Sequence, residues 1–480
     1  MQEQEIISIV RRLQKTKCET QTLEVKKAEK GAPERLYDTL SSFSNQDEGG
    51  VILFGFDESN GFVQVELFNA QALIKSIEEQ CKQMTPVVRP QITVAEIDGK
   101  TVVVAEIPGV EISERPVYYN GKGKVRGSFI RVGEADEAMS DYEVYAFEAF
   151  RKKIQDDLRI IDSKTINDLH PLKLKKFLLS ASENKPRLAA LPSDDILELL
   201  GVTKEGSLTL AGLLTLGVYP QSAFPFLSIT AVVVPGTEYG ETGTNGERFV
   251  ANRRFEGTIG EMLDDALIFV ARNMRKKTII DGNGRRADKE EYPKRAVREA
   301  ILNALMHRDY SVNTDGIPIQ IRMYNDRLEI ISPGGLYGRV TLQSLGKGQP
   351  DTRNRTIATI LEVLDVAENR YSGIPTIRRE CELSSLPEPK FEIIRGEFTV
   401  TFYNEQAVIE EKNIAIEDKL IEFCKTPRLR AEIVKFLGKT QYYALRTYID
   451  PLVAEGKLQL TLPDVPRSKH QKYVSRGENL

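Results

Sequence analysis

The sequence contains no tryptophan, only three histidines and only four cysteines, and each scarcity excludes a class of chemistry. The histidines, His170, His307 and His470, are too few and too scattered for a histidine-rich metal centre. The cysteines lie far apart and form no C-x-x-C pair, so neither a zinc site nor a disulfide framework is indicated. No apolar run reaches transmembrane length, and the first residues lack the apolar core of a signal peptide. The simplest interpretation is a cytoplasmic protein that does not enter a membrane.

The bulk composition is that of an ordinary globular protein. Of the 480 residues, 41% are hydrophobic and 28% are charged, and this length allows about three domains. The net charge of -4 excludes a uniformly basic nucleic-acid coat, although it permits local basic patches.

The N-terminal third alternates helix and strand patterns. Residues 1–16 have apolar side chains at helical spacing, and the segment "TLEVKKAE" alternates as a half-buried strand does. Residues 34–44 suit a helix, a buried strand follows at 51–56, and a hairpin is expected to turn at 98–99. This order predicts an α/β unit.

Three segments carry a resemblance to the AlbA-type domain of the Schlafen family over residues 1–150. They are Glu19-x4-Glu24-Val25-Lys26, "LSSFSNQDEGGVILFGFDE" and "GSFIRVGEADEAMSDYE". The chain departs from the family pattern by an extra residue between Asn45 and Gly49, which puts the shape of that loop in question. The resemblance implies contact with nucleic acid.

In nuclease members of the family, paired glutamates and an aspartate bind a divalent metal. The resemblance assigns this role to Glu19, Glu24 and Asp57, with Mg²⁺ or Mn²⁺ as the ion. Three carboxylates that meet at one point repel one another unless a cation lies between them. The alternative is that Glu24 pairs with Lys26 or another basic neighbour and only stabilises the strand.

A second chemical pattern lies in "REAILNALMHRDY". At helical spacing, Glu299, Asn303 and His307 fall along one side of a helix that begins at Pro293. Two strands follow, and then the Gly334-Gly335 turn. A carboxylate can polarise water and an amide oxygen can hold phosphate-bound Mg²⁺, so the row suits a nucleotide site. A solvated helix face is the alternative. The polar segment before Pro293 is expected to be a loop.

This series resembles the divergent ATP-binding domain of the GHKL (Bergerat) superfamily, from about residue 151 to 404. The resemblance makes Glu299 the general base and Asn303 the Mg²⁺ ligand, and it turns His307 and Arg308 toward the phosphates. It implies that glycines leave room for ATP, and that one of them lies under the phosphates at a helix start. These glycines are Gly334, Gly335 and Gly373.

Two positions depart from the GHKL pattern. Ser332 stands where an aspartate normally reads the adenine amino group, and Tyr371-Ser372 replaces a second glycine before Gly373. These departures leave the base preference and ATP hydrolysis open. A GHKL-shaped domain that has lost its ligand is the alternative.

The C-terminal segment, 405–480, predicts three helices and a β-ribbon, and residues 416–476 resemble a winged helix-turn-helix. Pro451 is expected to kink or end the third helix. Polar residues near the start of a recognition helix reach bases, and ribbon cations contact phosphates. The candidate nucleic-acid contacts are Lys439, Gln441, Tyr442, Arg446, Arg467, Lys469 and Lys472. The alternative is that this unit dimerises the protein or packs on the ATPase-like domain.

The sequence thus predicts an α/β (α+β) multidomain protein with units at 1–150, 151–404 and 405–480. The favoured function is a nucleotide-responsive transcriptional regulator that binds ATP, Mg²⁺ and DNA or RNA, as a homo-oligomer. The alternative is a metal-dependent Schlafen-type endoribonuclease acting in phage defence or stress. A third hypothesis makes the middle domain an ATP-held assembly scaffold. Whether the chain is an enzyme, as a weak ATPase or a nuclease, stays open.

Overall fold

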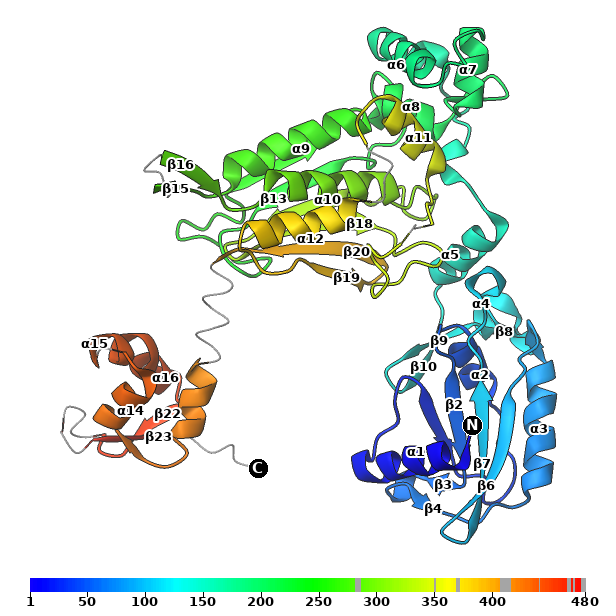
Figure 1. Ribbon diagram of the computed structural model, residues 1–480, viewed down its shortest axis with the longest axis vertical. Coiled ribbons are helices and arrows are strands. Elements are labelled where there is room, and N and C mark those ends of the chain that lie inside the picture. Colours follow the sequence, from blue (N-terminus) through cyan, green and yellow to red (C-terminus); the bar gives the residue numbers. More distant parts are fainter. Residues whose placement is uncertain are drawn as a thin grey trace.

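The computed structural model describes residues 1–280, 286–348, 351–367, 372–405, 416–439, 441–463, 468 and 471–475. We refer to 1–140 as the N-terminal unit, 141–405 as the middle unit and 416–475 as the C-terminal unit. Helices and strands are mixed in each (Figure 1), so the predicted α/β class is confirmed. No helix in the described residues is both long and apolar enough to span a bilayer.

A four-stranded mixed sheet forms the centre of the N-terminal unit. Its order is β1 (Leu23–Lys26), β2 (Gly50–Phe54), β7 (Lys100–Ile107), β6 (Gln91–Ile97). The first pair is parallel and the other two pairs are antiparallel. Helix α1 (Glu3–Thr16) buries an apolar stripe against one face, and α2 (Tyr37–Ser44) and α3 (Ala70–Lys82) cover the other. The predicted turn at 98–99 joins β6 and β7.

A small hairpin lies against α2 and leads out of the unit. Its strands are β9 (Phe129–Val132) and β10 (Ala135–Ala138), and both contact α2. Ser140 caps the next helix, α5 (Asp141–Lys152), with Glu143 completing a capping box. The shorter elements of this unit are β3 (Phe56–Asp57), β4 (Val63–Gln64), β5 (Met84–Thr85), β8 (Tyr118–Tyr119) and α4 (Gly123–Gly127).

The middle unit contains a six-stranded sheet covered on one face by helices (Figure 1). The strand order is β14 (Ala251–Phe255), β13 (Ile229–Val233), β17 (Ile319–Met323), β18 (Arg327–Pro333), β20 (Glu397–Tyr403), β19 (Lys390–Ile394). Only the β13–β17 pair among these is parallel. The covering helices are α9 (Ile259–Asn273), α10 (Lys294–His307) and α12 (Gly373–Leu383).

Further elements complete this unit. Helices α6 (Pro171–Asn184), α7 (Ser193–Leu199), α8 (Leu210–Leu216) and α11 (Arg355–Val363) lie at one end, with the hairpin β11 (Thr203–Lys204) and β12 (Ser207–Leu208). A second hairpin joins β15 (Lys276–Ile280) to β16 (Arg286–Glu290). The expectation of a loop before Pro293 is wrong for Arg286–Glu290, which form β16 and pair with the strand just before them in the chain. The charged sequence RADKE lacks the β-branched and aromatic residues that indicate a strand.

The C-terminal unit has helices on a three-stranded antiparallel sheet. A helix ending at residue 423 precedes β21 (Arg428–Leu429), α14 (Arg430–Leu437) and α15 (Gln441–Ala444). The helix continues through a π stretch, Leu445–Ile449, into α16 (Asp450–Ala454), and β22 (Leu458–Leu460) and β23 (Lys472–Ser475) follow. Pro451 does not end the helix. It lies in the first turn of α16, directly after the π stretch, a common way to accommodate a missing N–H.

Candidate nucleotide pocket and carboxylate network

Helix α10 presents the predicted polar row to a cavity. Its apolar side chains, Ala296, Val297, Ala300, Ile301, Ala304 and Leu305, are buried in the core of the middle unit. Glu299, Asn303 and His307 remain accessible and line a cavity of about 380 Å³. Helical spacing thus places the three polar side chains on one wall, as the sequence predicted.

The three glycines line the same cavity. A Cβ added to Gly373 would lie 2.9 Å from Nδ2 of Asn303 and 3.4 Å from Oε2 of Glu299. A Cβ on Gly334, whose φ is +99°, would lie 2.6 Å from the Cβ of Asp309. A side chain at Gly373 would therefore force the Asn303 amide to shift, whereas Gly334 is needed for both space and backbone conformation.

Ser332 also lines the cavity, but its hydroxyl hydrogen is already used. Its Oγ donates to the carbonyl oxygen of Ala304 at 2.9 Å, and the residue is 4% exposed. The Ser332 hydroxyl can therefore accept a hydrogen bond from a ligand, while the hydrogen bond that it donates links β18 to α10.

Arg308 does not face the cavity, and its expected position on the phosphate side is wrong. The residue is 2% exposed, and its Nη2 donates to the carbonyl oxygens of Thr314 and Ile317. The reason is local: α10 ends at His307, and Arg308 has φ -48° and ψ 144°. The chain has left the helix there, so helical spacing no longer decides where the side chain points.

Arg353 supplies the cation that Arg308 does not. It lines the cavity, its side chain is 7% exposed, and its Nη1 lies 2.9 Å from Oδ2 of Asp309. Its guanidinium lies 5.1 Å from the ring centroid of Tyr337, another lining residue. Sequence reasoning missed Arg353 because it stands in an irregular segment before α11, where no periodicity marks the side facing the cavity.

His307 is electrically neutral at physiological pH in this setting. The enclosing cavity walls, and to a lesser extent the charge of Arg353, lower the pKa of the imidazole to about 4. A neutral imidazole offers one N–H and one lone pair. His307 can therefore make hydrogen bonds to a ligand, while the positive charge at this end of the cavity belongs to Arg353.

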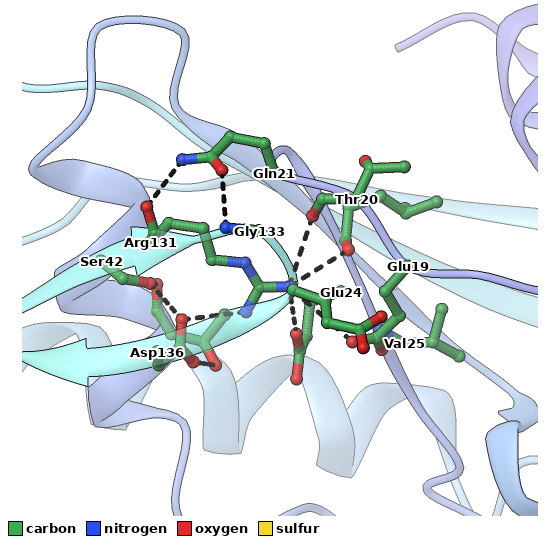
Figure 2. A network of polar contacts seen from close by, with 12 residues as sticks. Glu19, Thr20, Gln21, Glu24, Val25, Ser42, Arg131, Gly133 and Asp136 are labelled. Atoms are coloured by element: carbon green, nitrogen blue, oxygen red, sulfur yellow. Dashed lines mark hydrogen bonds and ion pairs between the residues drawn. The ribbon is translucent and has the colours of Figure 1, made fainter. Parts of the chain in front are cut away.

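A second polar site lies in the N-terminal unit, where Arg131 stands among acidic side chains (Figure 2). Its Nη2 lies 2.8 Å from Oε2 of Glu24 and 3.7 Å from Oε2 of Glu19, and its Nη1 donates to Asp136 at 2.9 Å. The Arg131 side chain is 1% exposed. This carboxylate network, Arg131 with Glu19, Glu24 and Asp136, is thus buried and held by a guanidinium.

The charges of the carboxylate network nearly balance if Glu19 is protonated. Burial, and next the charge of Glu24, raise the pKa of Glu19 to about 7. Glu24 also pairs with Lys26, so two anions, Glu24 and Asp136, face two cations. Burying one more negative charge would be costly, which is the physical cause of the raised pKa.

The three carboxylates that the resemblance joined are not brought together. Asp57 pairs with Lys27 at 2.7 Å, not with the glutamates, and within the described residues no group of three His, Cys, Asp or Glu side chains could hold a metal ion. The alternative partner expected for Glu24, Lys26, is observed. A nuclease role for Glu19, Glu24 and Asp57 stays a prediction.

Helix α5 connects the two sites. It begins three residues after β10, which carries Asp136. The hydroxyl of Tyr142 donates to Oδ2 of Asp309 at 2.6 Å, the oxygen that also pairs with Arg353. Eight residues on, the ring of Phe150 meets that of Tyr337 edge-on, with centroids 5.4 Å apart. Phe150 therefore packs on a residue of the cavity wall, and Tyr142 is connected to the lining residue Arg353 through Asp309.

The C-terminal candidates are only partly described. Gln441 begins α15, Arg446 lies in the π stretch that follows, and Lys472 is exposed at the start of β23. Lys439 is exposed just before α15. The Tyr442 side chain, and all of Arg467, Lys469 and His470, lie outside the described residues, as does Tyr371. The nucleic-acid contacts remain predictions.

Family comparisons bear on the first two units. Residues 19–140 match the family described as "Schlafen, AlbA_2", and residues 316–402 match the one described as "Putative ATP-dependent DNA helicase recG C-terminal", an ATPase-like domain. The chain carries a Schlafen AlbA_2 domain and an ATPase-like domain. Residues 146–227, which include most of α5, match a family described only as a domain of unknown function.

Two solved structures are similar to this chain. The DIP2311 protein from Corynebacterium diphtheriae is 19% identical, with a TM-score of 0.40, over 91% of this chain and 88% of that one. The N-terminal domain of a RecG-related protein from Nitrosomonas europaea is 23% identical, with a TM-score of 0.23, over 28% of this chain and 91% of that one. No curated protein matches the chain.

Proposed function

We propose that the protein binds ATP in the cavity of the ATPase-like domain and nucleic acid through its terminal units. Binding of the nucleotide then changes the affinity for nucleic acid, as in a transcriptional regulator. The observation that carries the proposal is the shared contact at Asp309, which joins Arg353 of the cavity to Tyr142 of the helix leaving the AlbA domain.

The cavity suits a nucleotide with Mg²⁺. Its volume, about 380 Å³, lies within the range of small-molecule sites. Gly373, at the first position of α12, lies beside Asn303 where a Cβ would crowd the amide. The amide oxygen of Asn303 would hold Mg²⁺, which neutralises phosphate charge when bound. Glu299 stands one turn away on α10 and lines the same cavity.

Helix α5 supplies a physical route for the response. A ligand shifts a conformational equilibrium only through contacts that differ between the states. A ligand that draws Arg353 away from Asp309 changes the contact that Tyr142 makes, and a ligand that moves Tyr337 changes the packing of Phe150. Both changes reach the helix that follows β10 of the AlbA domain.

Nucleic-acid binding is supported by the AlbA domain itself and by basic residues of the C-terminal unit. We propose that this unit is a winged helix, with Arg446 on the long helix and Lys472 on the ribbon contacting DNA. The proposed domain divisions are 1–150, 151–404 and 405–480. A homo-oligomer, and a scaffold role for ATP, are alternatives that light scattering with and without nucleotide would test.

The test is DNA affinity with and without Mg-ATP, measured by fluorescence anisotropy at matched salt and matched Mg²⁺. The proposal predicts a change of about fivefold or more, a typical coupling between sites. Tyr142→Phe should reduce the change, because it removes the hydroxyl that contacts Asp309. Tyr145→Phe is the matched control, since Tyr145 is also a tyrosine of α5 but its hydroxyl donates to Asp156. Equal affinities for the unaltered protein would remove the regulatory claim.

One observation bears on the nuclease alternative: Glu19 and Glu24 lie close together, but both lie against the guanidinium of Arg131. A metal ion would have to displace or share that guanidinium. We therefore infer that the AlbA domain binds nucleic acid without cleaving it.

A further inference from the structure

Arg353 is placed as a ligand-binding side chain. Three basic residues of the described chain line the cavity besides His307: Arg339, Lys347 and Arg353. Arg339 and Lys347 are exposed to solvent, whereas the side chain of Arg353 is buried, with 7% of its surface exposed. Its Nη1 is close enough to Asp309 for an ion pair but makes no hydrogen bond of good geometry within the described residues.

The other basic groups near this end do not compete for the role. The cavity setting lowers the pKa of His307 to about 4, so its imidazole is neutral near pH 7. Arg308 is committed to two backbone carbonyl oxygens and points away. An arginine is well suited to an oxyanion because its planar fork donates several hydrogen bonds at once and never loses its charge.

We infer that Arg353 is the anion-binding residue of the cavity, that it contacts a phosphate oxygen of the bound nucleotide, and that Asp309 competes with that phosphate for it. The inference rests on the proposed nucleotide site and goes beyond it by naming the group that distinguishes phosphorylated ligands from nucleosides. Asp309 is 3% exposed, and Tyr142 and the Ser311 amide also donate to it. Two hydrogen bonds to its carboxylate therefore remain when Arg353 turns to a ligand.

Competition gives the two residues opposite effects. Removing the guanidinium removes the charge that a phosphate meets. Removing the carboxylate charge leaves Arg353 fully available and makes the local potential more positive. If the two residues only supported the cavity wall, substitution of either Arg353 or Asp309 would weaken ATP binding. Opposite effects of the two substitutions would not arise.

The experiment compares ATP, ADP and adenosine by equilibrium binding to the full chain. Arg353→Gln should weaken ATP and ADP about tenfold or more, as expected for loss of a charge-assisted hydrogen bond, and leave adenosine within about twofold. Asp309→Asn should tighten ATP about threefold or more. Arg327→Gln is the matched control, because Arg327 is also an ion-paired arginine on this unit but does not line the cavity.

A double variant separates a loss of ATP binding from a loss of folding. Arg353→Gln alone leaves Asp309 as a buried carboxylate without its cation, which can destabilise the protein. Arg353→Gln combined with Asp309→Asn removes both charges. Like Arg353→Gln alone, this double variant should lack the preference for ATP over adenosine. Thermal unfolding of each variant shows whether the fold is intact.

The outcomes separate the inference from the proposal beneath it. If the unaltered protein binds neither ATP nor adenosine, the proposed function fails. If it binds ATP, and the double variant keeps the full preference for ATP over adenosine, only the role of Arg353 is overturned. Equal weakening of adenosine and ATP would place Arg353 against the nucleoside and overturn the phosphate assignment. A tenfold loss confined to ATP and ADP, with tighter binding by Asp309→Asn, supports it.

Discussion

The guanidinium of Arg131 lies 2.8 Å from the carboxylate of Glu24, so a cation of the protein itself already occupies the side of Glu24 that faces Glu19. Three acidic side chains share this one arginine, which is almost fully buried. Removing a buried cation from such a group leaves uncompensated charge, which costs about 3–5 kcal/mol. The arrangement favours a structural role for the paired glutamates.

Cleavage should therefore not depend on Glu24. The full chain incubated with tRNA and Mn²⁺, beside Glu24→Gln, should show the same background in both samples. Gel analysis of the tRNA checks this. Cleavage by the unaltered protein that disappears in Glu24→Gln would show that a metal does reach the glutamates, and the nuclease hypothesis would return.

Stability should depend on pH through Glu19. Its pKa in the folded protein is raised to about 7 from an ordinary value near 4.5, so the folded state binds the proton more tightly than the unfolded state. The contribution is fully present below about pH 4.5, is lost as pH rises toward 7, and is constant above that. Its size is about 1–3 kcal/mol.

Glu19→Gln should flatten this dependence, because glutamine is neutral at every pH. The measurement is the free energy of unfolding from urea titrations at several pH values between 4.5 and 7.5. Asp57→Asn is a control, since its pKa is lowered by Lys27 and lies outside that window. An unchanged slope in Glu19→Gln would contradict the protonation of Glu19.

Alanine substitutions at the two neighbouring glycines of the cavity, Gly334 and Gly335, should differ sharply in their effect on stability. Gly334→Ala should lose about 1–3 kcal/mol of stability, because φ is +99° and the new Cβ would lie 2.6 Å from the Cβ of Asp309. Gly335→Ala should be nearly neutral for stability, since its nearest neighbour would be Ile393 at an ordinary 3.7 Å. Thermal and urea unfolding of the two variants test this. Similar losses in both would argue against the described turn.

The C-terminal unit should contact nucleic acid through its basic residues. Arg446→Ala should weaken DNA binding and leave ATP binding intact, and the slope of log affinity against log salt should fall by about one unit if a phosphate contact is lost. Lys425→Ala is a control, because Lys425 is an exposed lysine of the same unit paired with Glu422. If both variants bind DNA like the unaltered protein, the unit has another purpose.

The sequence predicts those parts of the site that depend on local geometry. Glu299, Asn303 and His307 share a face because they lie on one helix, whose apolar residues fix its orientation. The prediction is wrong one residue later, at Arg308, because the helix has ended. Local periodicity therefore gives a side chain's direction only within the element that produces it.

The rest of the site depends on contacts between distant segments. Tyr142 meets Asp309 across 167 residues of chain, and Arg353 reaches the same carboxylate from an irregular segment. Asp57 likewise ends the short strand β3, where Lys27 engages it, while Arg131 engages the glutamates. Pairings of this kind arise only once the chain has folded, and no spacing in the sequence encodes them.

The most direct test of the account is equilibrium dialysis of labelled ATP with Mg²⁺ against the full chain and against Asn303→Ala. The account predicts saturable binding of one ATP per chain by the unaltered protein, and loss of the Mg²⁺-dependent part of that binding in the variant. The absence of binding by folded, unaltered protein at millimolar ATP, or equal Mg²⁺-dependent binding by Asn303→Ala, would contradict it.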